Sequence, residues 1–343
     1  MKLNLDQLRA AASGVSYVAE EDGAVAFHRF TERQEELYRR ERSKFANRPL
    51  MSAGVKLRFR TASGRLGIKA RVDTELRRRY FSMEVFANGK KVGELCNFDV
   101  NTIPFNYIFE PFETGSFSDC FELGEGEKEI CIHLPWGIKM NLEEITLDDG
   151  ASFVPVHTDK RLLCLGDSIT QGYDALHPSQ RYAARLAELL SAEEHNKAIA
   201  GEIFFPELAE LLSEESAPDY ISVAYGTNDW DQKNVEELEG NARAFFASLA
   251  AQFPESELIV ITPIWRADCE TADRPVSFTE LAQIIEEAAS CHPKAHVVNG
   301  LDIYPHDKAY FPDGYLHPGD EGFRCYSDGL ARVLKEIGMI KGE

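Results

Sequence analysis

Four separate segments of the sequence carry residue types that could act together in acyl transfer. A serine lies in Gly166-Asp-Ser168, a glycine stands at Gly201, an asparagine lies at Asn228, and Asp313 and His317 offer a carboxylate and an imidazole. Acyl transfer needs a hydroxyl nucleophile, a base for its proton, an acid that orients the base, and N–H donors for the oxyanion. The fold must therefore bring four distant segments to one place.

The second half of the chain predicts such a fold. Short apolar runs alternate with helix-like segments, and alternating strands and helices joined by short loops form a parallel sheet covered on both faces. Ligands bind at the carboxyl ends of such strands, and Ser168, Gly201 and Asn228 each follow a predicted strand. The predicted strands are 161–165, 196–200, 219–225, 257–262 and 295–299, and the predicted helices lie near 179–193, 206–214, 235–253, 277–290 and 320–337.

The first half has a different pattern. Residues 55–61 alternate apolar and basic side chains, as in a half-buried strand, and Asn88-Gly89 between two strand-like runs favours a tight hairpin turn. Several such runs predict a β-sandwich or jelly roll, with the exception of residues 31–44, which are typical of a surface helix. We therefore expect an N-terminal β-sandwich domain over residues 1–155 and an α/β domain over residues 156–343.

The four segments resemble, in order and approximate spacing, the sequence blocks of the SGNH (GDSL-type) hydrolase family. The resemblance covers about residues 160–343. Residues 27–34 and 52–59 are similar to the β-domain that precedes the hydrolase in some bacterial members. The resemblance implies a flavodoxin-like three-layer α/β/α hydrolase domain, preceded by an all-β sandwich of the jelly-roll type.

Carried over residue by residue, the resemblance implies that Ser168 is the nucleophile, His317 the general base and Asp313 the acid that orients it. The backbone N–H groups of Ser168 and Gly201 and the side-chain amide of Asn228 would form the oxyanion hole. The residue types suit these roles, because a serine hydroxyl is a poor nucleophile without a base in reach, and histidine ordinarily titrates near neutrality.

The acid and the base depart from the spacing of the family. Members usually have Asp-x-x-His, whereas three residues separate Asp313 from His317. One extra residue in a helical turn rotates the chain by about 100°. Either the turn bulges and restores the pair, or Asp313 is displaced and a backbone carbonyl orients His317. The alternative acids are Asp302, Asp307 and Asp320.

Other side chains near the predicted strand ends have two interpretations. Four of them could line an acyl or sugar pocket or could pack within loops: Tyr173, Trp230, Trp265 and Arg266. For Asp167 and Asp229 we favour a structural role, because carboxylates after strands commonly cap helices or tie loops together. The run Arg77-Arg78-Arg79 is a solvated strand edge or, alternatively, a contact with the acidic second half.

The charge of the chain restricts its partners. The formal net charge is −20, with 22 basic and 24 acidic side chains in residues 1–150 but 15 and 33 in residues 151–343. Such a surface repels nucleic acids and anionic membranes, so we expect neither as a partner. Seven scattered cysteines without a Cys-x-x-Cys pair, and an N-terminus interrupted by polar residues, favour a cytoplasmic location.

These observations predict a serine esterase that removes a small acyl group, most simply acetyl, from a carbohydrate or similar metabolite through an acyl-enzyme intermediate. This chemistry needs no metal and no organic cofactor. The small ester is the expected partner, and oligomer formation is left open. Two alternatives also stay open: acyl transfer by the same residues to an acceptor other than water, and a carbohydrate-binding protein that keeps the fold without catalysis.

Overall fold

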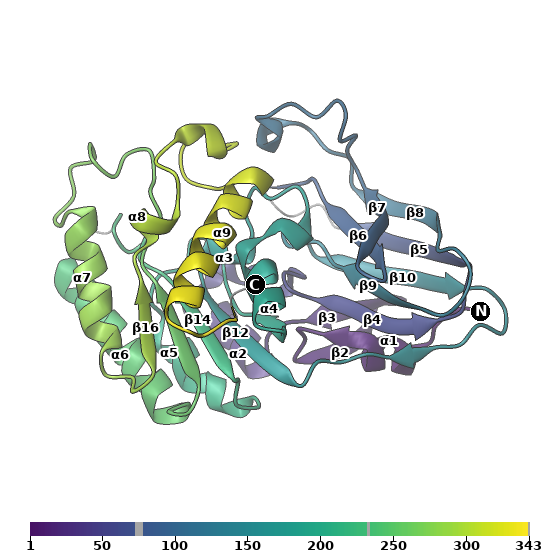
Figure 1. The fold of residues 1–343 in the computed structure, drawn as a ribbon, viewed down its shortest axis with the longest axis horizontal. Helices are drawn as coiled ribbons and strands as arrows, with labels where there is room; N and C mark the ends of the chain where they lie inside the picture. The colour runs from purple at the N-terminus through teal and green to yellow at the C-terminus, as the bar shows by residue number, and fades with distance from the viewer. Residues whose placement is uncertain (73–77, 232–233, 342–343) are drawn as a thin grey trace.

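The computed structural model describes residues 1–72, 78–231 and 234–341, so Arg77 of the basic run lies outside the described residues. Figure 1 shows antiparallel strands on one side of the molecule and a sheet flanked by helices on the other. We call the antiparallel portion the β-rich part and the portion with the parallel sheet the α/β part. The fold class expected from the sequence is confirmed.

Two antiparallel sheets face each other in the β-rich part. The elements are α1 Leu5–Ala11, β1 Ala12–Ser13, β2 Tyr17–Glu21, β3 Ala24–His28, β4 Lys56–Thr61, β5 Arg65–Val72, β6 Ser82–Ala87, β7 Lys90–Cys96, β8 Gly115–Glu122, β9 Lys128–His133, β10 Met140–Leu147 and β11 Val154–Pro155. One sheet has the order β1-β4-β9-β6-β7, with β11 beside β4, and the other β2-β3-β10-β5-β8. Phe59 and Ile132 of the first sheet pack with Ile68 and Ile145 of the second, which makes the part a sandwich.

The hairpin between β6 and β7 is the one that the sequence predicts. Its turn consists of Asn88 and Gly89, with φ angles of 48° and 75°. Both lie in the left-handed region that a type I′ turn requires, and glycine and asparagine tolerate that region best.

Helix α2 (Glu32–Glu41) corrects one expectation. The sequence pattern predicts a helix on the surface, but Leu37 and Tyr38 are buried against Ile199 and Phe205 of the α/β part. A narrow apolar stripe is sufficient here, because the other part of the chain covers that side of the helix. Helix α2 therefore connects the two parts.

A parallel five-stranded sheet forms the centre of the α/β part. Its strands are β12 Lys160–Gly166, β13 Ala192–Asn196, β14 Tyr220–Ala224, β15 Glu257–Ile261 and β16 Ala295–Val298, in the order β13-β12-β14-β15-β16. The helices are α3 Ser168–Gln171, α4 Tyr182–Leu189, α5 Pro206–Glu210, α6 Val235–Gln252, α7 Phe278–Ala289, α8 Gly300–Ile303 and α9 Asp320–Glu336. Leu162 and Cys164 of β12 pack toward α4 and α9, whereas Leu163 and Leu165 pack toward α6 and α7, so helices cover both faces.

Strand β13 lies earlier than the sequence pattern predicts. The apolar run suggests a strand over residues 196–200, but β13 ends at Asn196 and the following residues form a loop. Glu194 inside the strand is fully buried and accepts hydrogen bonds of 2.7 and 2.9 Å from Arg181. A buried ion pair thus takes the place of the apolar side chains that usually mark such a strand.

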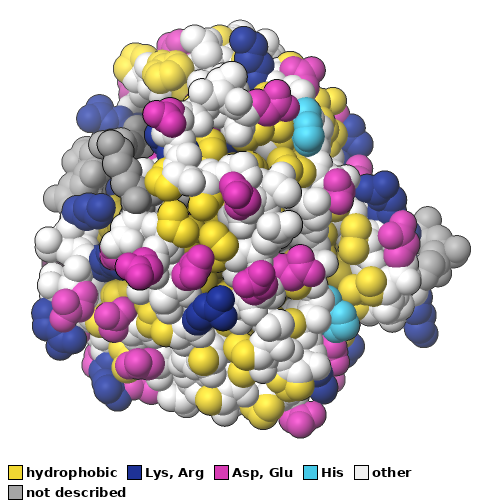
Figure 2. All heavy atoms as spheres, turned by 90° about the vertical axis from the view of Figure 1, so that its left-hand side faces the viewer, with side chains coloured by type: hydrophobic (Ala, Val, Ile, Leu, Met, Phe, Trp, Pro, Cys, Tyr) yellow, Lys and Arg dark blue, Asp and Glu magenta, His cyan; other side chains and the backbone are white. Residues whose placement is uncertain are grey.

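One face of the molecule carries acidic side chains across its centre, with basic side chains among and around them. Figure 2 shows acidic side chains spread across the centre of the side of the molecule that lies at the left of Figure 1. Among the residues that the structure describes, no helix combines the length and the apolar character needed to cross a membrane. All seven cysteines are free thiols.

Candidate active site

The turn from β12 into α3 places the buried Ser168 at the carboxyl end of β12, beside the central strand β14. Strand β12 ends at Gly166, and Asp167 caps the helix that begins at Ser168, since its Oδ1 accepts a 2.9 Å hydrogen bond from the N–H of Ile169. A Cβ at Gly166 would lie 2.2 Å from the Oγ1 of Thr170. Only glycine fits this sharp change from strand to helix, which fixes the direction of the serine.

The side chains of Ser168, His317 and Asp313 form a continuous hydrogen-bonded chain. His317 Nε2 lies 2.8 Å from Ser168 Oγ, and His317 Nδ1 lies 2.7 Å from Asp313 Oδ2. Burial of Asp313 opposes its ionisation, but the hydrogen bond and charge of His317 hold its pKa below the ordinary value. An imidazole between a hydroxyl and an ionised carboxylate is placed to take a proton from the hydroxyl.

The turn from Asp313 to His317 absorbs the extra residue without a helix. Asp313 Oδ1 accepts hydrogen bonds from the N–H groups of Tyr315 (2.8 Å) and Leu316 (2.9 Å), and Gly314 has a φ of 69°. The carboxylate therefore shapes the turn with one oxygen and meets the imidazole with the other.

The alternative acids have other contacts. Asp302 accepts from Asn299, and Asp307 accepts from the N–H of Ala309. Asp320 accepts a hydrogen bond from the N–H of Leu176 and forms an ion pair with His177 rather than with His317.

The expected oxyanion donors lie on neighbouring loops. Gly201 follows β13 with a φ of 78°. The side-chain amide of Asn228 donates to the carbonyl of Glu202 at 2.9 Å, beside Gly201. The N–H of Ala200 donates to Gln171 Oε1 at 2.9 Å, which ties this loop to the helix of the nucleophile. The loops after β12, β13 and β14 are thereby joined at one edge of the sheet.

A second carboxylate, that of Asp174, lies beside the imidazole and was not predicted from the sequence. Asp174 is fully buried, and its Oδ2 lies 3.9 Å from His317 Nδ1. Arg78 of the β-rich part donates to both oxygens of Asp174, at 2.7 and 3.2 Å. Burial raises the pKa of Asp174, although the charges of His317 and Arg78 oppose the rise. The only sequence signal was position, since Asp174 follows the nucleophile by six residues.

Asp174, Asp313 and His317 could also be considered as metal ligands, because one ligand atom from each lies within 4.8 Å of the others. The donor set is already occupied, however. Arg78 holds Asp174, and His317 Nδ1 is hydrogen-bonded to Asp313. The arrangement therefore fits a hydrogen-bonded catalytic group better than a cation site.

Residues 164–325 match the sequence profile of the GDSL-like lipase/acylhydrolase family. This part of the chain is a GDSL-like domain. Lipases and acylhydrolases cleave carboxylic esters, so the chain is a hydrolase of carboxylic ester bonds. No curated protein sequence matches the chain.

Solved structures resemble the whole chain rather than the GDSL-like domain alone. A salicylyl-acyltransferase from a tetracycline biosynthetic pathway has a TM-score of 0.77 at 18% identity, over 95% of this chain and 94% of that chain. A Bacteroides ovatus protein described as a GDSL-like lipase has 0.75 at 19% identity, over 100% and 99%. A family two carbohydrate esterase from Cellvibrio japonicus has 0.66 at 14% identity, over 98% and 97%. These likenesses show a shared fold that includes the β-rich part.

The four candidate pocket residues of the GDSL-like domain have different surroundings. The Tyr173 ring lies 5.5 Å from the His317 ring, at the site itself. The Trp265 ring stacks on the ring of Phe311 at 5.9 Å. Trp230 is 2% exposed and donates to a backbone carbonyl at 2.8 Å, which favours loop packing.

Arg266 is likewise a structural residue. It is 1% exposed, forms ion pairs with Asp231 and Asp268, and donates to the carbonyl of Thr227 at 2.9 Å. It also donates to the hydroxyl of Tyr315. Arg266 thus connects the loop of Asn228 with the turn that carries the imidazole, and its guanidinium is engaged within the protein.

The aspartates after the first and third strands have the structural roles that the sequence favours. Asp167 caps α3, and Asp229 Oδ1 accepts from the N–H of Phe204 at 3.1 Å. Burial raises the pKa of both carboxyls to about 7.

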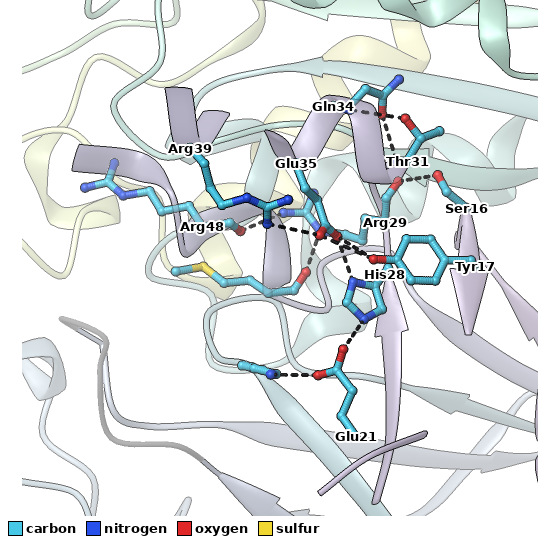
Figure 3. Close-up of polar contacts among 12 residues, drawn as sticks. Ser16, Tyr17, Glu21, His28, Arg29, Thr31, Gln34, Glu35, Arg39 and Arg48 are labelled. Carbon is cyan, nitrogen blue, oxygen red and sulfur yellow. Dashed lines mark hydrogen bonds and ion pairs between the residues drawn. The ribbon is translucent and has the colours of Figure 1, made fainter. Parts of the chain in front are cut away.

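The β-rich part also supports the Gly201 loop of the GDSL-like domain. Arg29 donates to the carbonyl of Ala198 at 3.3 Å, and Arg48 donates to the carbonyl of Ala200. Figure 3 shows both arginines among the polar contacts at this junction. A Cβ at Gly201 would lie 3.1 Å from Arg48 Nη1, so the side chain of Arg48 closely approaches the backbone at Gly201.

The same view shows how the start of α2 is fixed. His28 lies between Glu35 Oε1 at 2.7 Å and Glu21 Oε1 at 3.0 Å, and its ring stacks on Tyr17 at 4.1 Å (Figure 3). These contacts hold α2 against β3, next to Arg29.

Proposed function

We propose that the protein is a serine esterase that forms an acyl-enzyme intermediate on Ser168. The observation that carries the proposal is the hydrogen-bonded chain, with 2.8 Å between Ser168 Oγ and His317 Nε2 and 2.7 Å between His317 Nδ1 and Asp313 Oδ2. This geometry provides an activated hydroxyl and an oriented base.

In the first half-reaction, Ser168 Oγ bonds to the carbonyl carbon of the ester while its proton passes to His317 Nε2. The resulting oxyanion accepts hydrogen bonds from the N–H groups of Ser168 and Gly201 and from the amide of Asn228. That amide has two N–H groups, so one can stay on the carbonyl of Glu202 while the other meets the oxyanion.

The tetrahedral intermediate then collapses. The carbon–oxygen bond to the alcohol breaks, and His317 returns the proton to the leaving alcohol. In the second half-reaction, water gives a proton to His317 and its oxygen bonds to the acyl carbon. The ester bond to Ser168 then breaks while His317 returns the proton to Ser168 Oγ, so that a carboxylic acid leaves and the free serine and the neutral imidazole are restored.

We propose a small neutral ester, most simply an acetylated carbohydrate, as substrate. The −20 formal charge disfavours polyanionic substrates. An aromatic ring beside the imidazole, that of Tyr173, could contact a sugar ring. Carbohydrate esterases and an acetyl xylan esterase from Butyrivibrio proteoclasticus share the fold, which supports this substrate class.

Acyl transfer to an alcohol or amine acceptor is the second candidate. The likeness to a salicylyl-acyltransferase over 95% of the chain favours it. The acyl-enzyme is common to both reactions, and the second step alone differs. Adding increasing amounts of an alcohol during turnover separates them, because a transferase forms the new ester in preference to the acid.

The proposal is tested with a panel of p-nitrophenyl esters and acetylated xylo-oligosaccharides. We expect hydrolysis of acetyl esters by the wild type and none by Ser168→Ala. A fluorophosphonate should label the wild type at Ser168 only. Retained activity in Ser168→Ala excludes the assigned nucleophile, and an unlabelled, inactive wild type supports a binding protein without catalysis.

A further inference from the structure

The segment after the nucleophile helix is held in place by the β-rich part. We call residues 172–177 the Asp174 loop. The hydroxyl of Tyr107 donates to the carbonyl of Asp174, and Trp136 Nε1 donates to the carbonyl of Ala175 at 2.8 Å. A Cβ at Gly172 would lie 2.0 Å from the Cδ of Arg181, so the loop is tightly packed.

Within this loop, Asp174 has no role in the esterase mechanism described above. Burial of its carboxylate nevertheless has an unfavourable desolvation free energy. Its side chain is 0% exposed. A buried carboxylate requires a charged partner or several hydrogen bonds. Arg78 supplies two hydrogen bonds, and the hydroxyl of Tyr80 lies 3.5 Å from Oδ1. The β-rich part therefore provides the groups that satisfy this carboxylate.

The position of Asp174 relative to the imidazole is the second observation. Its Oδ2 lies 3.9 Å from His317 Nδ1, on the side where Asp313 makes its 2.7 Å hydrogen bond. The imidazole carries a positive charge midway through each half-reaction. A carboxylate at this distance attracts that charge without replacing Asp313 as the hydrogen-bond acceptor.

We propose that Arg78 and Asp174 form a positioning pair that holds a second carboxylate beside His317 and stabilises the imidazolium during catalysis. The proposal rests on the proposed esterase function and deepens it. Arg78 opposes the rise in the pKa of Asp174 that burial causes, and its two hydrogen bonds fix the distance of the carboxylate from the ring. The β-rich part thereby contributes to the electrostatics of a base that lies in the GDSL-like domain.

The charged groups that face the imidazole come from several elements. Asp313 belongs to the same turn, Asp174 to the Asp174 loop, and Asp167 to the cap of α3, while Arg78 reaches in from the β-rich part. Removal of the Asp174 charge leaves the other carboxylates in place and disfavours the imidazolium. The acidic limb of the pH–rate profile must then move to lower pH.

The test compares Asp174→Asn, Arg78→Gln and Arg78→Lys with the wild type in kcat and KM for p-nitrophenyl acetate between pH 5 and 9. The expected result for Asp174→Asn is about a tenfold loss of kcat with little change in KM, and an acidic limb at lower pH. Arg78→Gln should lose a similar factor, and Arg78→Lys should recover part of it. Asparagine keeps the shape of Asp174, so this variant should fold.

Arg65→Gln is the matched control, because Arg65 pairs with the partly exposed Asp148 within the β-rich part. Wild-type kcat is expected for it. An unchanged kcat and an unmoved acidic limb in Asp174→Asn overturn the proposal. A loss confined to KM, or one that follows the melting temperature alone, overturns it as well, since either indicates a purely structural role.

Fluorophosphonate labelling separates this proposal from the proposed function. If the wild type is not labelled, the esterase assignment fails. If the wild type is labelled and Asp174→Asn is labelled at the same rate at every pH, the assignment stands and the positioning pair is excluded.

Discussion

Asp313 and His317 are joined by a 2.7 Å hydrogen bond, although three residues separate them instead of the family's usual two. The bond is possible because the other oxygen of Asp313 accepts from the N–H groups of Tyr315 and Leu316 and bends the chain back on itself. One carboxylate thus builds the turn and orients the imidazole, and the longer spacing leaves the pair intact.

Replacement of Asp313 by asparagine should lower kcat by roughly 10³- to 10⁴-fold, as in other serine hydrolases that lose the acid of the triad. An amide can still accept from the turn, so the melting temperature should change little. Steady-state hydrolysis of p-nitrophenyl acetate measures the loss. Asp302→Asn, which alters a carboxylate bonded to Asn299, is the control. A loss below tenfold would mean that Asp313 is not the orienting acid.

Replacement of Asn228 by alanine should reduce kcat by about 10²- to 10³-fold, because one oxyanion donor is removed. KM should change less than kcat, since the lost contact forms only in the transition state. The exposed Asn101, which contacts Asp99, provides the control variant Asn101→Ala. Equal activity in both variants would exclude Asn228 from the oxyanion hole.

Replacement of Arg29 by methionine should destabilise the protein by about 2–4 kcal/mol, because the buried carbonyls of Met51 and Ala198 lose a charged donor. The residual folded enzyme should also have a lower kcat, because the loop from Ala198 to Gly201 would lose a hydrogen bond that holds its backbone in position. Urea unfolding and turnover at low temperature measure the two effects. Stability equal to that of the wild type would show that these hydrogen bonds contribute nothing.

The stability should fall between about pH 7 and pH 10 in a way that depends on His177. Although burial opposes it, hydrogen bonds to Asp320 and Glu94 raise the pKa of His177 to about 10. The folded state therefore binds a proton that the unfolded state has lost above its ordinary pKa near 6.5. This contribution is complete below that pH and disappears as the pH rises through 10.

His177→Gln should remove this dependence. The difference in unfolding free energy between wild type and variant should be largest below about pH 6.5, by about 4–5 kcal/mol, and should fall towards zero as the pH rises through 10. Taking the difference cancels groups that titrate in the same range, such as Lys197, whose pKa burial lowers to about 8. A difference that stays constant from pH 6 to 10 would contradict the assignment.

The proximity of the segments that carry Ser168, Gly201 and Asn228 could be predicted because each follows a strand, and parallel strands end at the same side of a sheet. The alternation of apolar and helical segments was sufficient for that. The position of β13 was not predictable in the same way, because Glu194 in the strand is buried by an ion pair with Arg181. Hydrophobic periodicity cannot detect a strand whose interior residues are charged.

The contacts between the two parts were also beyond the sequence pattern. The alternative interpretation of the basic run, a contact with the acidic second half, holds for Arg78, which pairs with Asp174. Nothing in either local sequence identifies the other as its partner. Such pairs depend on how two separately patterned halves dock, and neither half specifies that alone.

The burial of Arg29 has a consequence for any exchange of one half of this protein for that of a relative. Arg29 directly follows β3 of the β-rich part, and its guanidinium is buried against backbone carbonyls of the α/β part. This burial lowers the pKa of Arg29 to about 9. An exchange of either half for that of a relative must preserve both the cation and its carbonyl acceptors. We therefore expect the two halves to unfold together rather than independently.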